Sequence, residues 1–122
     1  MTSNRMKYCS LDTAKTTDNT PTIVNITAIP KNSACQMDIS VIARDLDTGD
    51  SIINRKIYTV KNVEGTLTLN KTITNLITNQ GDVSLLAVSS DVSASDSNIV
   101  VSVAGLLATN IIWLVNTEIL VN

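Results

Sequence analysis

Histidine is absent from this sequence of 122 residues. Enzymes use histidine more than any other side chain for proton transfer near neutral pH, and it is the commonest metal ligand. Its absence argues against catalytic triads and most zinc sites. Glycine is also scarce, at four residues, so no glycine-rich phosphate-binding loop can be assembled. From these absences we predict that the protein is not an enzyme and uses no cofactor.

The two cysteines, Cys9 and Cys35, have neither C-x-x-C spacing nor a histidine partner that would favour a thiolate. A cysteine nucleophile is therefore not expected. Free thiols are favoured at both positions, and one disulfide between them is the alternative.

The chain also lacks an excess of positive charge. The formal net charge is -2, and no run of lysine or arginine offers a surface that could neutralise phosphates. We therefore expect no nucleic-acid partner.

Aromatic residues are few: the chain has no phenylalanine, two tyrosines and one tryptophan. The core must then come from isoleucine, valine, leucine and alanine. Side chains branched at Cβ favour strands over helices, and a chain of this length forms one domain. The sequence predicts an all-β protein.

Alternating polarity and turn residues predict about seven strands in a single antiparallel β-sandwich, either immunoglobulin-like or jelly-roll-like. Residues 1–20 are polar with little periodicity and are expected to form a flexible or extended N-terminal arm, and residues 21–122 the sandwich domain. Ile42 alone breaks the alternation of the second strand. The predicted strands are 22–29, 35–44, 52–61, 66–73, 83–89, 99–103 and 111–121, with a polar loop over 90–97.

The turn after the second strand carries Asp45, Asp47 and Asp50 around Gly49. Three carboxylates so close together could hold a hard cation such as calcium. A helix-flanked calcium loop also needs a glutamate at its last position, where both carboxylate oxygens bind the ion. In this sequence that position is Lys56, so a hairpin turn with solvated acids is favoured. These aspartates are weak metal candidates, and no metal is expected.

Residues 98–115 are almost uncharged and nearly long enough to cross a bilayer as a helix. Gly105 and Thr109-Asn110 interrupt the segment, and its β-branched residues favour strands, so a buried hairpin is the preferred interpretation. A period of two then places Ile111, Trp113, Val115 and Ile119 on one face.

The aromatic residues Tyr8, Tyr58 and Trp113 could instead form a sugar-binding platform. Trp113 lies on the apolar side of its predicted strand, which favours a core or subunit-interface anchor.

The order of several short motifs resembles that of the small β-domains of tailed-phage and related virion proteins. The matching segments are Thr16-Thr-Asp-Asn-Thr-Pro-Thr22, Ile29-Pro30, Val41-Ile-Ala-Arg-Asp-Leu-Asp-Thr-Gly-Asp-Ser51, Val101-Ser-Val-Ala-Gly105 and Thr109-Asn-Ile-Ile-Trp113. This resemblance covers about residues 16–121. It implies a virion location, after assembly in the host cytoplasm, and an oligomeric state, but brings no catalytic residues with it.

We therefore predict a virion structural protein, either a capsid decoration (cement) protein or a spike or fibre subunit. It would act by self-association, with a homotrimer favoured, and by binding the major capsid protein or other virion proteins. One alternative is a receptor- or carbohydrate-binding module at a tail-fibre tip, with Trp113 or Tyr58 exposed; another is a small membrane protein. The predicted interface residues lie in the N-terminal arm and the C-terminal strands: Tyr8, Leu11, Ile111, Trp113, Val115 and Ile119.

Overall fold

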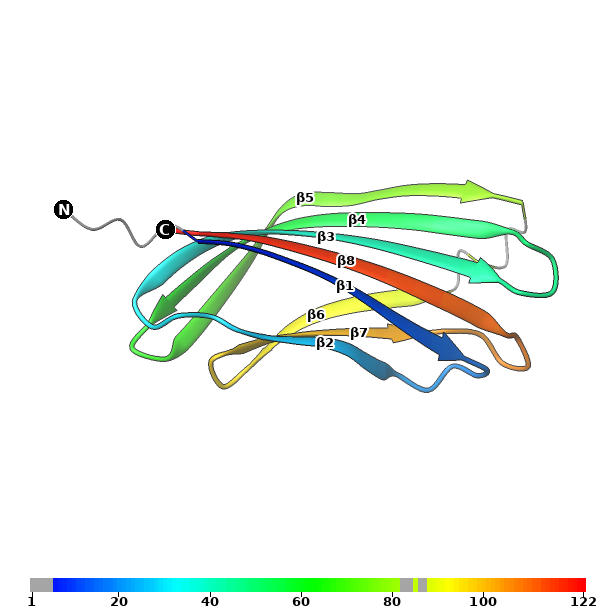
Figure 1. Cartoon of the computed structure of the whole chain (residues 1–122), viewed down its shortest axis with the longest axis horizontal. Coiled ribbons are helices and arrows are strands. Elements are labelled where there is room, and N and C mark those ends of the chain that lie inside the picture. The colour runs from blue at the N-terminus through cyan, green and yellow to red at the C-terminus, as the bar shows by residue number, and fades with distance from the viewer. Residues whose placement is uncertain (1–5, 82–84, 86–87) are drawn as a thin grey trace.

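Two antiparallel β-sheets pack face to face in the computed structural model, which describes residues 6–81, 85 and 88–122 (Figure 1). The five-stranded large sheet has the order β1 (Met6–Thr16), β8 (Ile111–Val121), β3 (Ser33–Asp45), β4 (Ser51–Val63) and β5 (Thr66–Gln80). The three-stranded small sheet has the order β2 (Thr22–Ala28), β7 (Asn98–Ala104) and β6 (Ser89–Ser95). The prediction of an all-β sandwich is confirmed, with eight strands in the described residues where about seven were expected.

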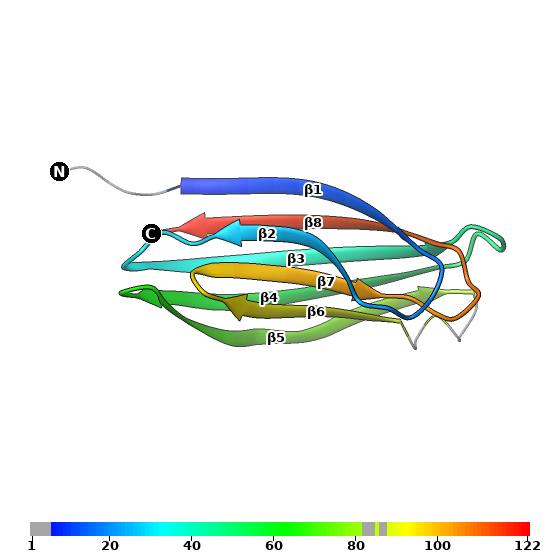
Figure 2. The same cartoon turned by 90° about the horizontal axis from the view of Figure 1, so that it is seen from below.

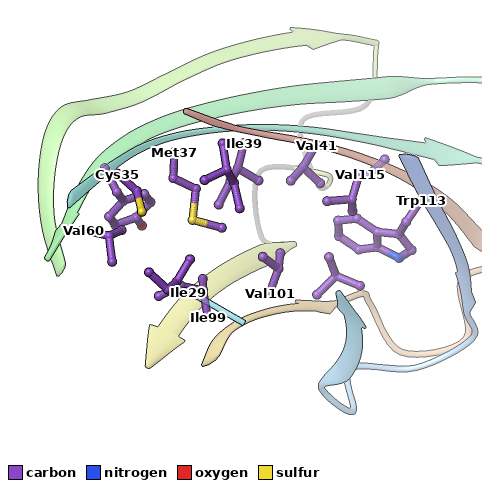
Figure 3. Packing of buried hydrophobic residues seen from close by; sticks show 14 of the residues in the cluster. Ile29, Cys35, Met37, Ile39, Val41, Val60, Ile99, Val101, Trp113 and Val115 are labelled. Atoms are coloured by element: carbon purple, nitrogen blue, oxygen red, sulfur yellow. The ribbon is translucent and has the colours of Figure 1, made fainter. Parts of the chain in front are cut away.

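The core lies between the sheets and follows the alternation of the strands. In β8 the residues with odd numbers are buried and their neighbours point outward, as a strand with one covered face requires. β3 shows the same pattern over most of its length. Figure 3 shows Met37, Ile39 and Trp113 of the large sheet opposite Ile99 and Val101 of the small sheet.

The second and third predicted strands form the expected hairpin, β3–β4. Its turn is closed by the amide of Gly49, which donates to the carbonyl of Asp45 at 2.8 Å. Gly49 has a φ of 80°, in the region where only glycine avoids a Cβ penalty. The turn residues therefore set this hairpin locally.

The apolar C-terminal segment does not form the buried hairpin that we expected. β7 lies in the small sheet and pairs with β2 and β6, whereas β8 lies in the large sheet between β1 and β3. The connection between β7 and β8 thus crosses from one sheet to the other. Two consecutive apolar strands each bury one face in the same core, so their polarity pattern is the same whether they pair or face each other. No helix of the described residues is long and apolar enough to span a membrane.

The N-terminal segment also differs from the expected arm. Residues 6–16 form β1, which pairs with β8 along its whole length, from Met6 with Val121 to Thr16 with Ile111. β1 runs beside β8 at the boundary of the large sheet (Figure 2). The inward positions of β1 include the small polar residues Ser10, Asp12 and Thr16. The strand consequently lacks the apolar alternation that would have revealed it.

The expected polar loop over 90–97 is largely a strand as well. β6 pairs with β7 from Ser89 with Ala104 to Ser95 with Asn98. It is the edge of the small sheet, so a serine-rich sequence is tolerated there. The fifth predicted strand, 83–89, falls mainly outside the described residues.

Candidate interaction surface

The predicted interface residues fall into two groups. Tyr8 and Leu11 on β1 are exposed, at 44% and 66% of their surface. The other four, which lie on β8, are each at most 2% exposed. Those four side chains belong to the core of this chain and cannot contact another protein while the chain is folded. That part of the prediction is wrong; its residues are Ile111, Trp113, Val115 and Ile119.

Trp113 is fixed in the core by a specific hydrogen bond. Its indole Nε1–H donates to the hydroxyl of Thr16 at 2.8 Å, and both residues are buried. Because Thr16 ends β1, this bond ties the edge strand to the centre of the sandwich. Gly105 leaves room for it, since a Cβ at that position would overlap Thr16 Oγ1.

A sugar-binding platform on Trp113 or Tyr58 required at least one of them to be exposed. Trp113 is 1% exposed and Tyr58 is 7% exposed. Burial also raises the pKa of the Tyr58 hydroxyl, with a smaller contribution from the nearby charge of Asp91. The rings of Trp113 and Tyr58 are therefore not available to a glycan, and the prediction of a platform on either of them is wrong.

The aspartates around Gly49 shape the hairpin turn. Asp45 is buried, and its Oδ1 accepts hydrogen bonds from the amides of Asp47 at 2.8 Å and Thr48 at 3.4 Å. A carboxylate used in this way sets the local turn. In the part of the chain that the structure describes, Asp45, Asp47 and Asp50 do not form a group of acids, histidines or cysteines that could hold a metal.

Both cysteines are free in the structure. Cys9 is exposed on β1, whereas Cys35 is buried at the start of β3. Burial raises the pKa of the Cys35 thiol, and the hydrogen-bonding contact with Ser33 partly offsets this. Cys35 is thus a core residue rather than a reactive group.

An apolar strip crosses the outer face of the large sheet, on the side away from the core. In the register of the sheet, Leu114 of β8 lies beside Ile42 of β3, which lies beside Ile53 of β4. Ile112 joins them one outward position along β8 and is 37% exposed, and Ile53 is 40% exposed. We call Ile42, Ile53, Ile112 and Leu114 the outer strip. The polarity patterns of the sequence did not predict the outer strip, although Ile42 breaks the alternation of its strand.

Two cations border the outer strip. Ile112 pairs with Lys15 of β1 on one side and with Arg44 of β3 on the other. Neither Lys15 nor Arg44 has an ion-pair partner within the described residues. Ion pairs do occur farther along the sheet, where Arg55 contacts Asp38 at 2.6 Å and Lys7 contacts Glu118 at 3.2 Å. The end of the strip that contains Ile112 is therefore apolar with a positive border.

A groove of about 790 Å³ lies at the opposite end of the large sheet. Its lining includes two lysines, Lys7 and Lys61, together with amide and hydroxyl side chains such as Gln36 and Thr59. No aspartate or glutamate is among the described residues that line it.

No protein family and no curated protein matches the sequence. Three solved structures that are similar to this chain are phage tailspike proteins. The tailspike of Acinetobacter baumannii phage AM24 matches with a TM-score of 0.48 at 9% identity, over 91% of this chain and 26% of the tailspike. The tailspike of Acinetobacter phage vB_ApiP_P1 matches with a TM-score of 0.47 at 15% identity, over 100% of this chain and 22% of the tailspike.

The third match is the tailspike gp49 of Acinetobacter baumannii bacteriophage Fri1, with a TM-score of 0.41 at 17% identity over 93% of this chain. Gp49 is a capsular polysaccharide depolymerase, and this chain corresponds to only 17% of it. That match contradicts the prediction that the chain is not an enzyme, and the prediction is withdrawn. The chain spans about a quarter or less of the length of all three tailspikes.

Proposed function

We propose that this chain is a structural domain of a bacteriophage virion protein, which associates with itself and binds other virion proteins. The observation that carries the proposal is the outer strip. One face of the large sheet is buried in the core of the chain. The other face also carries four neighbouring aliphatic side chains, those of the outer strip. A cluster of partly exposed aliphatic side chains is typical of a protein contact site. The virion setting comes from the ordered resemblance over residues 16–121.

The outer strip can supply useful binding energy. Complete burial of an aliphatic side chain is worth about 1.5–3 kcal/mol. Ile53 and Ile112 retain roughly 40% of their exposure, so covering the four residues would gain roughly 2–4 kcal/mol by the same rule. That gain offsets part of the entropy lost when two proteins associate.

The border of the strip indicates what covers it. Two copies stacked with the Ile112 ends of their strips together would bring Lys15 and Arg44 of both copies close together, which is unfavourable. A different virion protein with an apolar patch bordered by carboxylates would match both the strip and its cations. We therefore assign the strip to a contact with another virion protein, either in a spike or fibre or on a capsid as a decoration.

Mass spectrometry of purified particles of the phage that encodes this chain tests the virion setting. We expect peptides of the chain in amounts that match a structural component. Particles that lack these peptides would refute the proposal.

Binding of the purified chain to particles from which it has been removed tests the contact surface. Ile53→Lys should lower binding at least tenfold, because it places a charge in the strip, and Arg44→Glu should also weaken binding by reversing the border charge. Ile23→Lys is the matched control, since Ile23 is also an exposed isoleucine, at 59%, but lies on the small sheet. Equal binding of the Ile53 and Ile23 variants would exclude the strip as the contact.

A further inference from the structure

The four edge strands of the sandwich differ in how well they are protected. An unpaired edge offers its main-chain groups to any other strand, and proteins usually blunt such edges with bulges, prolines or short strands. β2 has a register irregularity between Ile23 and Asn25 and is flanked by two prolines. β5 has register shifts where it pairs with β4, and β6 has only seven residues.

β1 has none of these three protections, although it carries the charged residues Lys7, Asp12 and Lys15. It is eleven residues long, its register with β8 is unbroken, and it contains neither proline nor glycine. β1 is also held in place: Asn25 Nδ2 donates to Asp12 Oδ2 at 2.9 Å and to Ser10 Oγ at 3.1 Å. A long, straight and fixed edge is ready to accept a further strand.

We propose that β1 pairs with β1 of a second copy, antiparallel, about a two-fold axis that passes beside Ser10. Such a contact uses the same surface on both copies. It deepens the self-association in the proposed function, on which it rests, by naming the segment that makes it. Main-chain hydrogen bonds would provide the affinity, and the exposed side chains of Cys9 and Leu11 would meet across the axis.

The charges of β1 select this register from the alternatives. Side chains that lie opposite each other in the two copies must point to the same face of the joined sheet. Odd-numbered residues therefore pair with odd-numbered ones, and even-numbered residues with even-numbered ones. With Leu11 on the axis, Lys7 of each copy would lie opposite Lys15 of the other, and with Asp12 on the axis the two Asp12 side chains would meet. Like charges directly opposite each other are destabilising.

The registers centred on Tyr8, Cys9, Ser10, Thr13 or Ala14 have no such conflict. Pairing centred on Ser10 covers residues 6–14 of each strand, whereas pairing centred on Cys9 or Thr13 covers only residues 6–12 or 10–16, and the other two cover less. Pairing centred on Ser10 forms the most main-chain hydrogen bonds and is therefore preferred. It places Cys9 opposite Leu11 of the partner copy, with both side chains on the outer face.

The pairing has a consequence for the assembly. Two large sheets would join edge to edge, and both outer strips would lie on the same side of the joined sheet. The pair could then bind a virion protein through two strips at once, which raises the overall affinity. A two-fold contact also gives an even number of copies, unlike the homotrimer that the sequence resemblance favours.

Disulfide trapping tests the register directly. The native chain, which has Cys9, is mixed with the double variant Cys9→Ser/Leu11→Cys, and oxidised glutathione is added. Directly opposed residues in an antiparallel pair lie at a distance that a disulfide can bridge. We expect a cross-linked dimer in the mixture and none from either protein alone.

The other outcomes of the trapping experiment overturn the proposal. Cross-linking of the native chain alone would place Cys9 on the axis, and cross-linking of the double variant alone would place position 11 there. No cross-link in any sample would exclude β1 pairing. Binding of the chain to particles without any β1 cross-link would leave the proposed function standing and remove this inference alone.

Light scattering of the untrapped protein gives a second test. The native chain should have the mass of a dimer, and Leu11→Lys should raise the dimer Kd by on the order of tenfold or more, because it adds a charge on each side of the axis. Leu107→Lys is the matched control, since Leu107 is 70% exposed against 66% for Leu11. A monomeric or trimeric native chain, or equal Kd values for the two variants, would refute the pairing, and circular dichroism confirms that both variants are folded.

Discussion

Removal of the Thr16 hydroxyl should destabilise the whole sandwich, although Thr16 lies at the end of an edge strand. In Thr16→Val a methyl group replaces the hydroxyl with little change in shape. Trp113 Nε1–H then loses its acceptor, which lies at 2.8 Å, in a site where both side chains are at most 4% exposed. A buried donor without a partner costs about 1–3 kcal/mol.

The single tryptophan makes this effect easy to measure. Urea unfolding followed by Trp113 fluorescence reports both the stability of the chain and the surroundings of the indole. A loss of about 2 kcal/mol lowers the urea midpoint by roughly 1 M and lowers Tm by about 8 °C for a domain of this size. All samples are compared at one low protein concentration, because association also raises apparent stability.

Thr13→Val is the matched control. Thr13 lies on the same strand but is exposed, so its substitution should change stability by less than about 0.5 kcal/mol. If Thr16→Val also stayed within this range, with native fluorescence, the link between β1 and the core would not contribute to stability. The reasoning about Trp113 as a bonded core anchor would then be wrong.

Three further changes should show how the interior is held. The buried side-chain amide of Asn62 donates a hydrogen bond to the carbonyl of Ile29 at 2.9 Å. Asn62→Ala removes this donor and leaves the carbonyl without it, so the free energy of unfolding measured in urea should fall by about 2–4 kcal/mol. Gly105→Ala should cost about 1–3 kcal/mol, since the added Cβ would overlap Thr16 Oγ1. The Cys35 thiol has a pKa raised above its ordinary value of 9.0 by burial, so unfolding releases its proton above that pH. Stability is therefore full below about pH 9 and falls as the pH rises, and Cys35→Ala should reduce this loss in urea titrations from pH 8 to 10.

Each of these changes has a control. Asn70→Ala and Leu107→Ala alter exposed residues and should stay within about 0.5 kcal/mol of the native chain. Cys9→Ala replaces the exposed cysteine and is the control for Cys35→Ala. An Asn62 variant as stable as the Asn70 variant would contradict a structural role for the buried amide. An alkaline loss equal in the Cys35 and Cys9 variants would place its origin elsewhere, for example at Tyr58.

Sequence patterns predicted the local features of this protein well. The alternation in 35–44 and 111–121 identified the inward faces of β3 and β8, and the aspartates around Gly49 identified the hairpin that joins β3 to β4. These signals are strong because one covered face imposes a period of two and because a tight turn needs particular residues. β1 and β6 were missed because edge strands bury little, so their polarity carries no comparable pattern.

The sequence by itself determined the class of fold and which residues share a face of each strand, since β-branching and alternation act locally. Tertiary structure alone decided what covers each face. It assigned β7 and β8 to different sheets, buried Trp113 in its own core rather than at a subunit contact, and left Ile42, Ile53, Ile112 and Leu114 together on an open surface. A polarity pattern records only that a side chain avoids water. Whether that side chain is buried by its own chain or by another protein depends on strand pairings between residues far apart in sequence. No local pattern in the sequence encodes those pairings.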